Sequence, residues 1–347
     1  MNIVIKNVII VHVWVIAFLV TPLVTAAQVD GLYEAQVPVS SQDANERSKG
    51  LRAALRKVII KTSGQSSFFS SQDSVLSRAS HLVEQFGYRS RQLDGKRQSY
   101  LWARFNPEGV RRAVHDAGLP VWPEERPSTL IWLAVEDNQE RLILAGDSEH
   151  PVRDMLYEIA NERGLPIVLP LMDLSEQSEI QFSDVASLAP EHLLEQSAKY
   201  DSQYMLIGHI QSTEDGHWRG RWHVASDEQE VTLTPTGTLA DILASGINPL
   251  TNRIASEFSS FAYVGSPQYL DIVIQDLNGA NDYANSLKYL ESLSLVSQVD
   301  VTHVEGRNVW FQVHTRADMA AFLQVIELGR VLYARDSTDQ LVFGLTP

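Results

Sequence analysis

Apolar residues recur along this chain with two different periods, which alternate from one segment to the next. Residues 129–135 (TLIWLAV) and 203–211 (QYMLIGHIQ) are apolar runs of strand length. Residues 44–61 instead place apolar side chains on one arc of a helix, namely Leu51, Ala54, Leu55, Val58 and Ile59. Strands and helices that alternate in this way predict a mixed fold with both α+β and α/β parts.

Proline and glycine divide the chain into segments of domain size. Residues 118–127 (GLPVWPEERP) contain three prolines, which fix φ and remove backbone donors, so this segment is typical of a stiff linker. A second break occurs at 264–267 (VGSP). Because 347 residues exceed the ~150 of one typical domain, we expect a multidomain chain. The expected parts are an N-terminal α+β domain at 28–118, a Pro-rich linker at 119–127, an α/β domain at 128–262 and a third domain at 266–347.

The third domain shows the clearest order of elements. Its hydrophobic pattern predicts strands and helices in the order βαββαβ, which is the ferredoxin-like pattern, followed by one extra strand at 341–345. Pairing Val304 with Val309 across the turn between two of these strands sets His314 opposite Val299. We therefore expect a C-terminal ferredoxin-like domain, a fold that by itself names no function.

Residues 1–27 have the pattern of an export signal. Lys6 supplies a positive start, residues 8–20 are largely apolar, and Thr25-Ala26-Ala27 places small residues where signal peptidase requires them. We expect cleavage after Ala27 and a periplasmic location. The alternative is an uncleaved N-terminal anchor in the inner membrane, since a bilayer is spanned by ~20 apolar residues.

Composition and charge narrow the classes of function. The absence of cysteine excludes disulfides, thiolate zinc sites and cysteine nucleophiles. A net charge of −15 argues against nucleic acid as a partner, because binding of nucleic acid requires a cationic protein surface. Residues 28–118 contain 14 Lys and Arg against 9 Asp and Glu, whereas residues 119–347 contain 13 against 34. The first domain is therefore basic and the remainder is strongly acidic.

One basic stripe is the candidate binding site. Lys49, Arg52 and Arg56 lie within one narrow arc of the helix at 44–61, beside its apolar arc. Such a stripe can dock an anionic protein partner, a lipid headgroup surface or an acidic face of the chain's own other domains. The alternative is an ordinary solvated helix face.

Local motifs for catalysis or metal binding are absent from the sequence. It has no G-x-S-x-G, S-x-x-K, H-E-x-x-H, P-loop or G-x-G-x-x-G pattern. His217 and His223 are six residues apart on one expected strand, or ~20 Å, too far to share a metal ion. His209 on the preceding strand is expected to approach Arg221 or Gly220, depending on the turn between them.

Acidic and aromatic pairs have simple structural interpretations. Glu136-Asp137 and Glu214-Asp215 fall at expected turns, where carboxylates normally face solvent. Trp218 and Trp222 share one face of an expected strand, which we assign to the core. We therefore predict no catalytic residues, no metal site and no cofactor.

The order of these features resembles a family of exported proteobacterial proteins, domain-of-unknown-function family number 2066. The segments that carry the resemblance lie mainly within residues 30–262 and are LYEAQVPV (32–39), LRAALRKVIIKTSG (51–64), GLPVWPEERPSTLIWLAVED (118–137), GLPIVLPLMDL (164–174) and YDSQYMLIGHI (200–210). The resemblance implies a periplasmic bacterial protein and carries no catalytic residues with it. The middle segment is also similar to α/β modules in accessory proteins of envelope machines.

These observations favour a non-enzymatic periplasmic adaptor or accessory protein of the bacterial cell envelope. Its expected partner is another envelope protein, with possible peripheral membrane contact. Two alternatives remain open: a hydrolase or transferase acting on the envelope through a site between domains, and a protein that binds a small ligand.

The signal pattern generates the first prediction. We expect the protein recovered from the periplasm to begin at Gln28 or within two residues of it, because Thr25-Ala26-Ala27 is the cleavage site. N-terminal sequencing checks this. Retention of Met1 in protein that sediments with membranes would establish the anchor instead.

Overall fold

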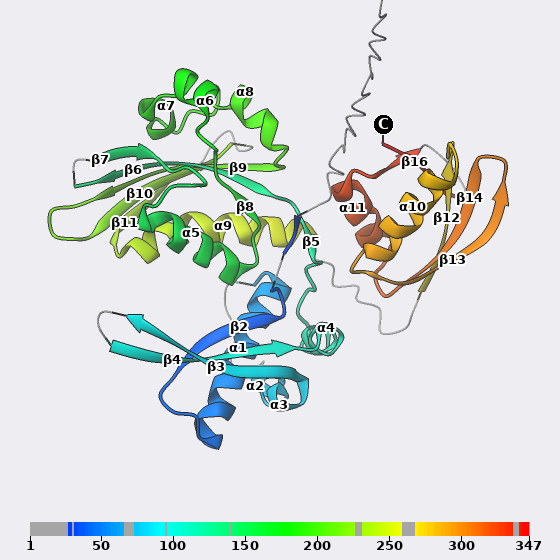
Figure 1. Cartoon of the computed structure of the whole chain (residues 1–347), viewed down its shortest axis with the longest axis horizontal. Helices are drawn as coiled ribbons and strands as arrows, with labels where there is room; N and C mark the ends of the chain where they lie inside the picture. The colour runs from blue at the N-terminus through cyan, green and yellow to red at the C-terminus, as the bar shows by residue number, and fades with distance from the viewer. Residues whose placement is uncertain are drawn as a thin grey trace, which may run out of the picture.

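The computed structural model describes residues 27–29, 31–65, 73–93, 96–138, 140–225, 231–258, 268–335 and 340–346. Within these ranges it contains eleven α-helices, three main β-sheets and one two-stranded sheet, so the chain is a multidomain mixture of helices and strands (Figure 1). The expected signal at 1–27, except its last residue, and the break at 264–267 lie outside the described residues. No helix of the described ranges is long and apolar enough to cross a membrane.

The N-terminal unit is a three-stranded antiparallel sheet with helices on one face. The strand order is β2-β4-β3, with β2 at Glu34–Val39, β3 at Val83–Leu93 and β4 at Lys96–Phe105. The helices are α1 (Ala44–Ser63), α2 (Asp73–Leu76), α3 (Ala79–Leu82) and α4 (Pro107–Asp116). Alternate residues of β4, namely Leu101, Ala103 and Phe105, are fully buried and pack in one core with the apolar arc of α1. The opposite face of this sheet is not covered by these helices.

The middle unit is a sheet with helices on both faces. The strand order is β11-β10-β9-β6-β7, and the short β8 also pairs with the beginning of β6. The strands are β6 (Thr129–Asp137), β7 (Glu140–Ile143), β8 (Ile167–Val168), β9 (Tyr204–Ser212), β10 (Trp218–Val224) and β11 (Val231–Gly237). The helices are α5 (Pro151–Arg163), α6 (Leu174–Glu179), α7 (Phe182–Ala186), α8 (Leu194–Ser197) and α9 (Leu239–Phe258).

The burial pattern of β6 explains this three-layer arrangement. Seven consecutive residues of β6 are buried, as the apolar run predicts for a strand covered on both faces. Ile131, Leu133 and Val135 share a core with α5 and α9, whereas Leu130 and Trp132 share a second core with residues of α7 and its neighbours. Figure 1 shows the two helical layers on opposite sides of the sheet.

Trp222 fills the core on the α9 side, as its strand position predicts. It is 2% exposed, and two glycines make room for its ring. A Cβ atom at Gly246 would lie 2.4 Å from the Trp222 ring, and one at Gly208 would lie 2.3 Å from it. Any larger residue at either position would therefore displace the indole or the backbone.

The C-terminal unit differs from the expected ferredoxin-like sheet. Its strand order is β13-β14-β12-β16-β15, with helices α10 and α11. In a ferredoxin-like sheet the strand after the second helix pairs with the first strand. Here the final strand β16 pairs in parallel with β12 and separates β15 from it, so the ferredoxin-like assignment is not confirmed. The elements are β12 (Gln268–Gln275), α10 (Ala280–Ser292), β13 (Val296–Glu305), β14 (Asn308–Thr315), α11 (Met319–Gly329), β15 (Leu332–Arg335) and β16 (Leu341–Leu345).

Arg126 lies at the joint between the N-terminal and middle units. It belongs to β5 (Glu125–Arg126), which pairs with β1 (Ala27–Gln28), and its side chain is completely buried against the ring of Trp122. Its guanidinium donates hydrogen bonds to backbone carbonyls, among them Lys61 at the end of α1 (2.8 Å) and Gly164 at the end of α5 (2.6 Å). One cation therefore satisfies the carbonyl ends of two helices from different units.

Two further buried cations complete this joint. Arg163 donates to the backbone carbonyl of Gly64 (2.9 Å) and to the side-chain oxygens of Asn248 and Asn252. Lys61 is 5% exposed, and its ammonium group donates to the Glu34 carbonyl (3.1 Å) and to the side-chain oxygen of Asn161 in the middle unit (3.0 Å). Burial lowers the pKa of Lys61 to about 8.

The C-terminal unit contacts the same proline-rich segment through the residue next to Arg126. The Glu125 carboxylate accepts hydrogen bonds from the backbone N–H (2.7 Å) and the hydroxyl (2.6 Å) of Ser294. Arg316 forms an ion pair of 2.7 Å with Glu108 of α4, which adds a second polar contact. The segment expected to be a linker is thus buried between units where it contains β5.

The lowered pKa of Lys61 generates a prediction about pH. Below pH 8 the lysine is charged in both the folded and the unfolded protein, and burial of that charge costs free energy. Between about pH 8 and the unfolded value near 10.4 the unfolded protein binds more protons, so the free energy of unfolding should rise with pH by at most ~1.4 kcal/mol per pH unit.

The contribution of Lys61 is isolated by comparison with Lys61→Met. Denaturant unfolding at several pH values between 7 and 10.5 should give a steeper rise for the wild type than for the variant. Parallel pH profiles for the two proteins would show that Lys61 keeps an ordinary pKa.

Candidate functional site

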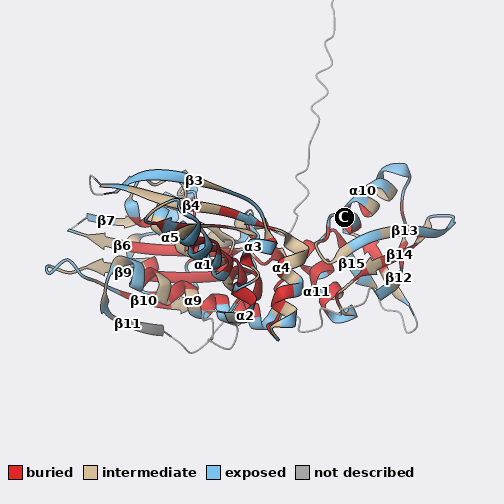
Figure 2. Ribbon diagram, turned by 90° about the horizontal axis from the view of Figure 1, so that it is seen from below, coloured by how far each residue is buried: buried red, intermediate tan, exposed pale blue. Residues whose placement is uncertain are grey.

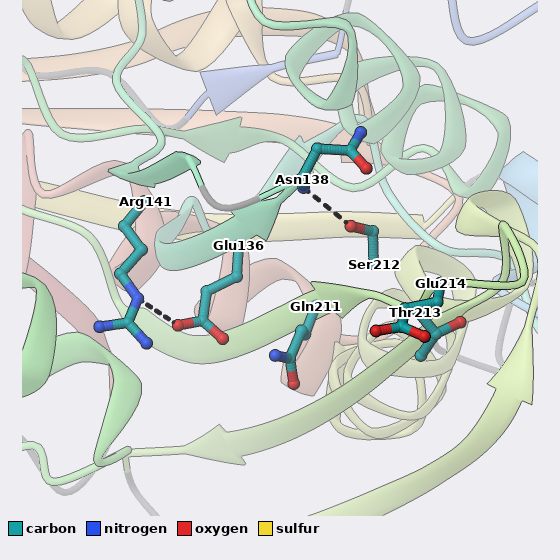
Figure 3. A pocket seen from close by; sticks show the side chains of 7 residues that line it. All are labelled: Glu136, Asn138, Arg141, Gln211, Ser212, Thr213 and Glu214. Atoms are coloured by element: carbon teal, nitrogen blue, oxygen red, sulfur yellow. Dashed lines mark hydrogen bonds and ion pairs between the residues drawn. The ribbon is translucent and has the colours of Figure 1, made fainter.

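The candidate site is a polar pocket at one edge of the middle sheet. It has a volume of 740 Å³, within the usual range for small-molecule sites. Its wall comes from the ends of β6 and β9, from the residues that follow them and from Arg141 on β7 (Figure 3). The lining residues are Glu136, Asn138, Arg141, Gln211, Ser212, Thr213 and Glu214.

The topology of the sheet places this pocket at a reversal of strand order. β6, β8 and β9 run parallel, with β8 and β9 on opposite sides of β6. The chain passes from β6 through the antiparallel β7 and then α5 to β8, and from β8 through α6, α7 and α8 to β9. Helices α5 and α7 pack on opposite faces of the sheet, and the pocket lies at the carboxyl ends of β6 and β9, the edge at which open α/β sheets bind ligands.

Glu136 and Arg141 form one end of the pocket. The Arg141 Nε atom lies 2.5 Å from the Glu136 Oε1 atom, and the Glu136 side chain is only 13% exposed. The expectation that Glu136 faces solvent at a turn is wrong, because β6 extends to Asp137 and β7 pairs Arg141 directly opposite Glu136. The ion pair leaves the two terminal nitrogens of Arg141 able to contact a ligand.

His209 lies behind Glu136 and links it to the next strand. The register places His209 opposite Arg221, one of the two expected neighbours. An Arg221 NH2 group donates to His209 Nδ1 (3.1 Å), so the ring proton belongs on Nε2, which faces a Glu136 oxygen at 3.6 Å. Burial and the Arg221 charge lower the pKa of His209, and the Glu136 charge raises it, with a net lowering. His209 is therefore a neutral group beside Glu136, with no hydrogen bond between the two side chains.

The remaining polar groups of the pocket are partly committed to each other. Gln211 accepts a hydrogen bond from Arg219 (3.1 Å) through Oε1, which leaves its amide N–H groups for a ligand. The Ser212 hydroxyl accepts from the Asn138 backbone N–H (3.1 Å) and retains its own proton. Thr213 bonds within its turn, to the His217 carbonyl at 2.8 Å.

The pocket therefore has an arginine–glutamate ion pair at one end and a second carboxylate, Glu214, at the other. Figure 3 shows Arg141 beside Glu136 on one side, Gln211 in the middle, and Thr213 with Glu214 on the other side. Arg141 and Gln211 present N–H donors, whereas Glu214 lies exposed on the β9–β10 turn. This arrangement suits a small molecule with a carboxylate at one end and an ammonium group at the other.

The basic stripe of the sequence lies elsewhere, on the exposed side of α1. Lys49 is 73% exposed and forms a long ion pair (3.9 Å) with Glu46. Arg52 and Arg56 are also exposed, and Arg52 contacts the Ser48 carbonyl of its own helix. The three side chains share one face of α1, far in sequence from the pocket, and their binding role stays a prediction.

Metal-ligating side chains are not gathered at any one point of the described ranges. Groups of three or more His, Asp or Glu that could hold an ion do not occur there.

On the C-terminal sheet, bulges in β13 change the register that we expected between β13 and β14. They set His314 opposite Gln298 instead of Val299.

One family model matches the N-terminal part of the chain. Residues 26–123 match the model of a domain of unknown function, DUF8605, which covers the N-terminal unit and the start of the proline-rich segment. The resemblance to family number 2066 is therefore wrong: the family model that matches is a different domain of unknown function, and of the segments that carried the resemblance it covers 32–39, 51–64 and the start of 118–137. No curated protein matches the sequence.

Among solved structures, the chain is similar to a formyltetrahydrofolate deformylase from Pseudomonas putida KT2440. The two are 11% identical, and the match covers 55% of this chain and 89% of the other. The TM-score is 0.20, so the similarity supports no assignment of fold or function.

The environment of His209 generates a prediction for its titration. We expect a pKa below the ordinary value of 6.5, because burial and Arg221 disfavour the imidazolium. Glu136→Gln should lower the pKa further, whereas Arg221→Gln should raise it. NMR titration of the His209 ring checks both signs, and Glu140→Gln at the tip of the β6–β7 hairpin is the matched control. Equal pKa values in all four proteins would refute the described cluster.

Proposed function

We propose that this chain is an exported, periplasmic accessory protein of the bacterial cell envelope, non-enzymatic, whose middle unit binds a small amphoteric ligand. The observation that carries the proposal is the pocket at the carboxyl ends of β6 and β9, with Arg141 at one end and Glu214 at the other. Amino acids and short peptides are the ligand class with matching charges.

Export is supported by the N-terminal sequence. Residues 1–27 have the three parts of a signal peptide, and the match to the domain model begins at residue 26, beside the expected cleavage position. An adaptor role is supported by the arrangement of three units around one buried segment, which holds separate surfaces in a fixed relation. Ligand binding at the pocket would give such an adaptor a means to respond to its surroundings.

The test uses three forms of one dipeptide. Alanyl-alanine carries both charges, its N-acetyl form lacks the ammonium group, and its C-terminal amide lacks the carboxylate. Titration calorimetry with the mature protein should detect the parent dipeptide and weaker binding of both modified forms. Each lost charged contact should weaken binding by about tenfold, which corresponds to ~1.4 kcal/mol.

Variants locate the site and separate the two ends. Arg141→Gln should abolish discrimination against the amide, and Glu214→Gln should abolish discrimination against the acetylated form. Glu195→Gln on exposed α8 removes a carboxylate from the same unit outside the pocket and should change neither. Absence of binding by all three compounds would refute the ligand class, and cleavage of the dipeptide, detected by mass spectrometry, would make the protein an enzyme.

A further inference from the structure

The uncovered face of the N-terminal sheet carries stacked arginine and aromatic side chains. Tyr100, Trp102 and Arg104 alternate with the buried residues of β4 and so point away from α1. On the neighbouring strand, Arg89 lies over the Trp102 ring (5.5 Å) and Arg91 lies over the Tyr100 ring (5.7 Å). Figure 2 shows β3 exposed along most of its length, at the periphery of the molecule.

The two arginines of β3 differ from the third arginine of this face. Arg104 is neutralised by Glu34, whose Oε1 atom lies 2.6 Å from an Arg104 NH2 group. Within the described ranges, no carboxylate lies at ion-pair distance from Arg89 or Arg91. Stacking orders each guanidinium on a ring and leaves its N–H edge open to an anion.

A donor with no partner lies on the same face. The Gln36 amide nitrogen is buried and, in the part of the chain that the structure describes, donates to no acceptor. Gln36 is paired with Trp102 across the sheet and lines a pocket of 330 Å³ that Arg89 and Trp102 also line. A buried unsatisfied amide costs free energy, and rotation of the Gln36 amide toward the pocket would let a carbonyl or carboxylate of a partner recover it.

We propose that this face, defined by Arg89, Arg91, Tyr100, Trp102 and Gln36, binds an extended acidic segment of another protein. This inference rests on the proposed adaptor role and names the surface that serves it. Arg89 and Arg91 are two positions apart on β3, about 6.8 Å, which is the spacing of alternate side chains in any extended chain. The matching segment therefore has Asp or Glu at alternate positions.

The charges at the margin favour a narrow segment over a flat anionic surface. The pocket beside Trp102 continues to α5, where Glu158 and Glu162 belong to its lining, and Glu162 is paired there with Lys57 (2.5 Å). A membrane of anionic lipid would meet the carboxylate of Glu158 together with the arginines, whereas an extended peptide can follow β3 and avoid it. The surface charge therefore complements a strand with alternate carboxylates.

The experiment uses two labelled peptides of equal charge. In one, six Glu alternate with six Thr; in the other, Glu-Glu pairs alternate with Thr-Thr pairs, so no two Glu are two positions apart. Fluorescence anisotropy with the mature protein at low salt should show tighter binding of the alternating peptide, and 1 M salt should weaken it. Equal affinity for both peptides would overturn the proposed register.

Two charge-reversal variants identify the surface. Arg89→Glu/Arg91→Glu should weaken binding of the alternating peptide at least about tenfold, whereas Arg52→Glu/Arg56→Glu makes the same charge change on α1 and should alter it less than about twofold. Arg89→Gln/Arg91→Gln gives a milder loss if the reversal disturbs folding, which circular dichroism would reveal. The opposite ranking would overturn the proposal and assign the anionic partner to α1.

Further probes distinguish this proposal from its competitors and from the ligand pocket. Phosphatidylglycerol vesicles or a single-stranded oligothymidine that bind through Arg89 and Arg91 more tightly than the peptide would replace the acidic segment as the partner. Arg141→Gln should leave peptide binding unchanged. Loss of dipeptide binding with retained peptide binding, or the reverse, therefore shows which of the two proposals fails.

Discussion

The buried guanidinium of Arg126 is the interaction on which the arrangement of the units depends. Its charge has no carboxylate at ion-pair distance among the described residues, and it is tolerated because backbone carbonyls and the Trp122 ring surround it. Two of those carbonyls, Lys61 and Gly164, belong to the ends of α1 and α5, so movement of either helix would break a hydrogen bond to the buried cation. Lys61 and Arg163 repeat this solution nearby, with carbonyl and amide oxygens as their acceptors. The contact between the units thus consists of directional hydrogen bonds, which would break if one unit shifted along the other.

The two proposed binding surfaces lie on units that this joint holds together. The pocket of the middle unit follows from the order of its parallel strands, and the arginine–aromatic face follows from a sheet with helices on one side only. Both surfaces use guanidinium groups that neighbouring side chains keep in place, Glu136 in one case and aromatic rings in the other. Preorganisation of this kind lowers the entropy cost of binding.

Much of the architecture could be predicted from local pattern, whereas the sites could not. The arc of Leu51 and Leu55 and the apolar run of β6 predict buried faces directly. Strand order is not a local property, so the sequence alone does not show that β16 enters between β12 and β15 or that the ends of β6 and β9 meet. The sequence does contain one indication of the pocket, because polar residues follow two buried strands directly, at 136–138 and 211–214. The interpretation of Glu136 as a solvent-facing turn residue hides that indication. Bulges such as those in β13 likewise could not be predicted from the pattern of apolar and polar residues.

Because Glu125 and Arg126 are adjacent, evolution can insert or delete few residues near them. Consecutive residues of an extended strand point in opposite directions, so one side chain reaches Ser294 while the next reaches the ends of α1 and α5. Insertion or deletion of a single residue before this pair would exchange the two directions, placing a carboxylate among carbonyls and a guanidinium beside a serine. Homologues should therefore vary freely in the lengths of their surface loops while the spacing from Trp122 to Arg126 stays constant.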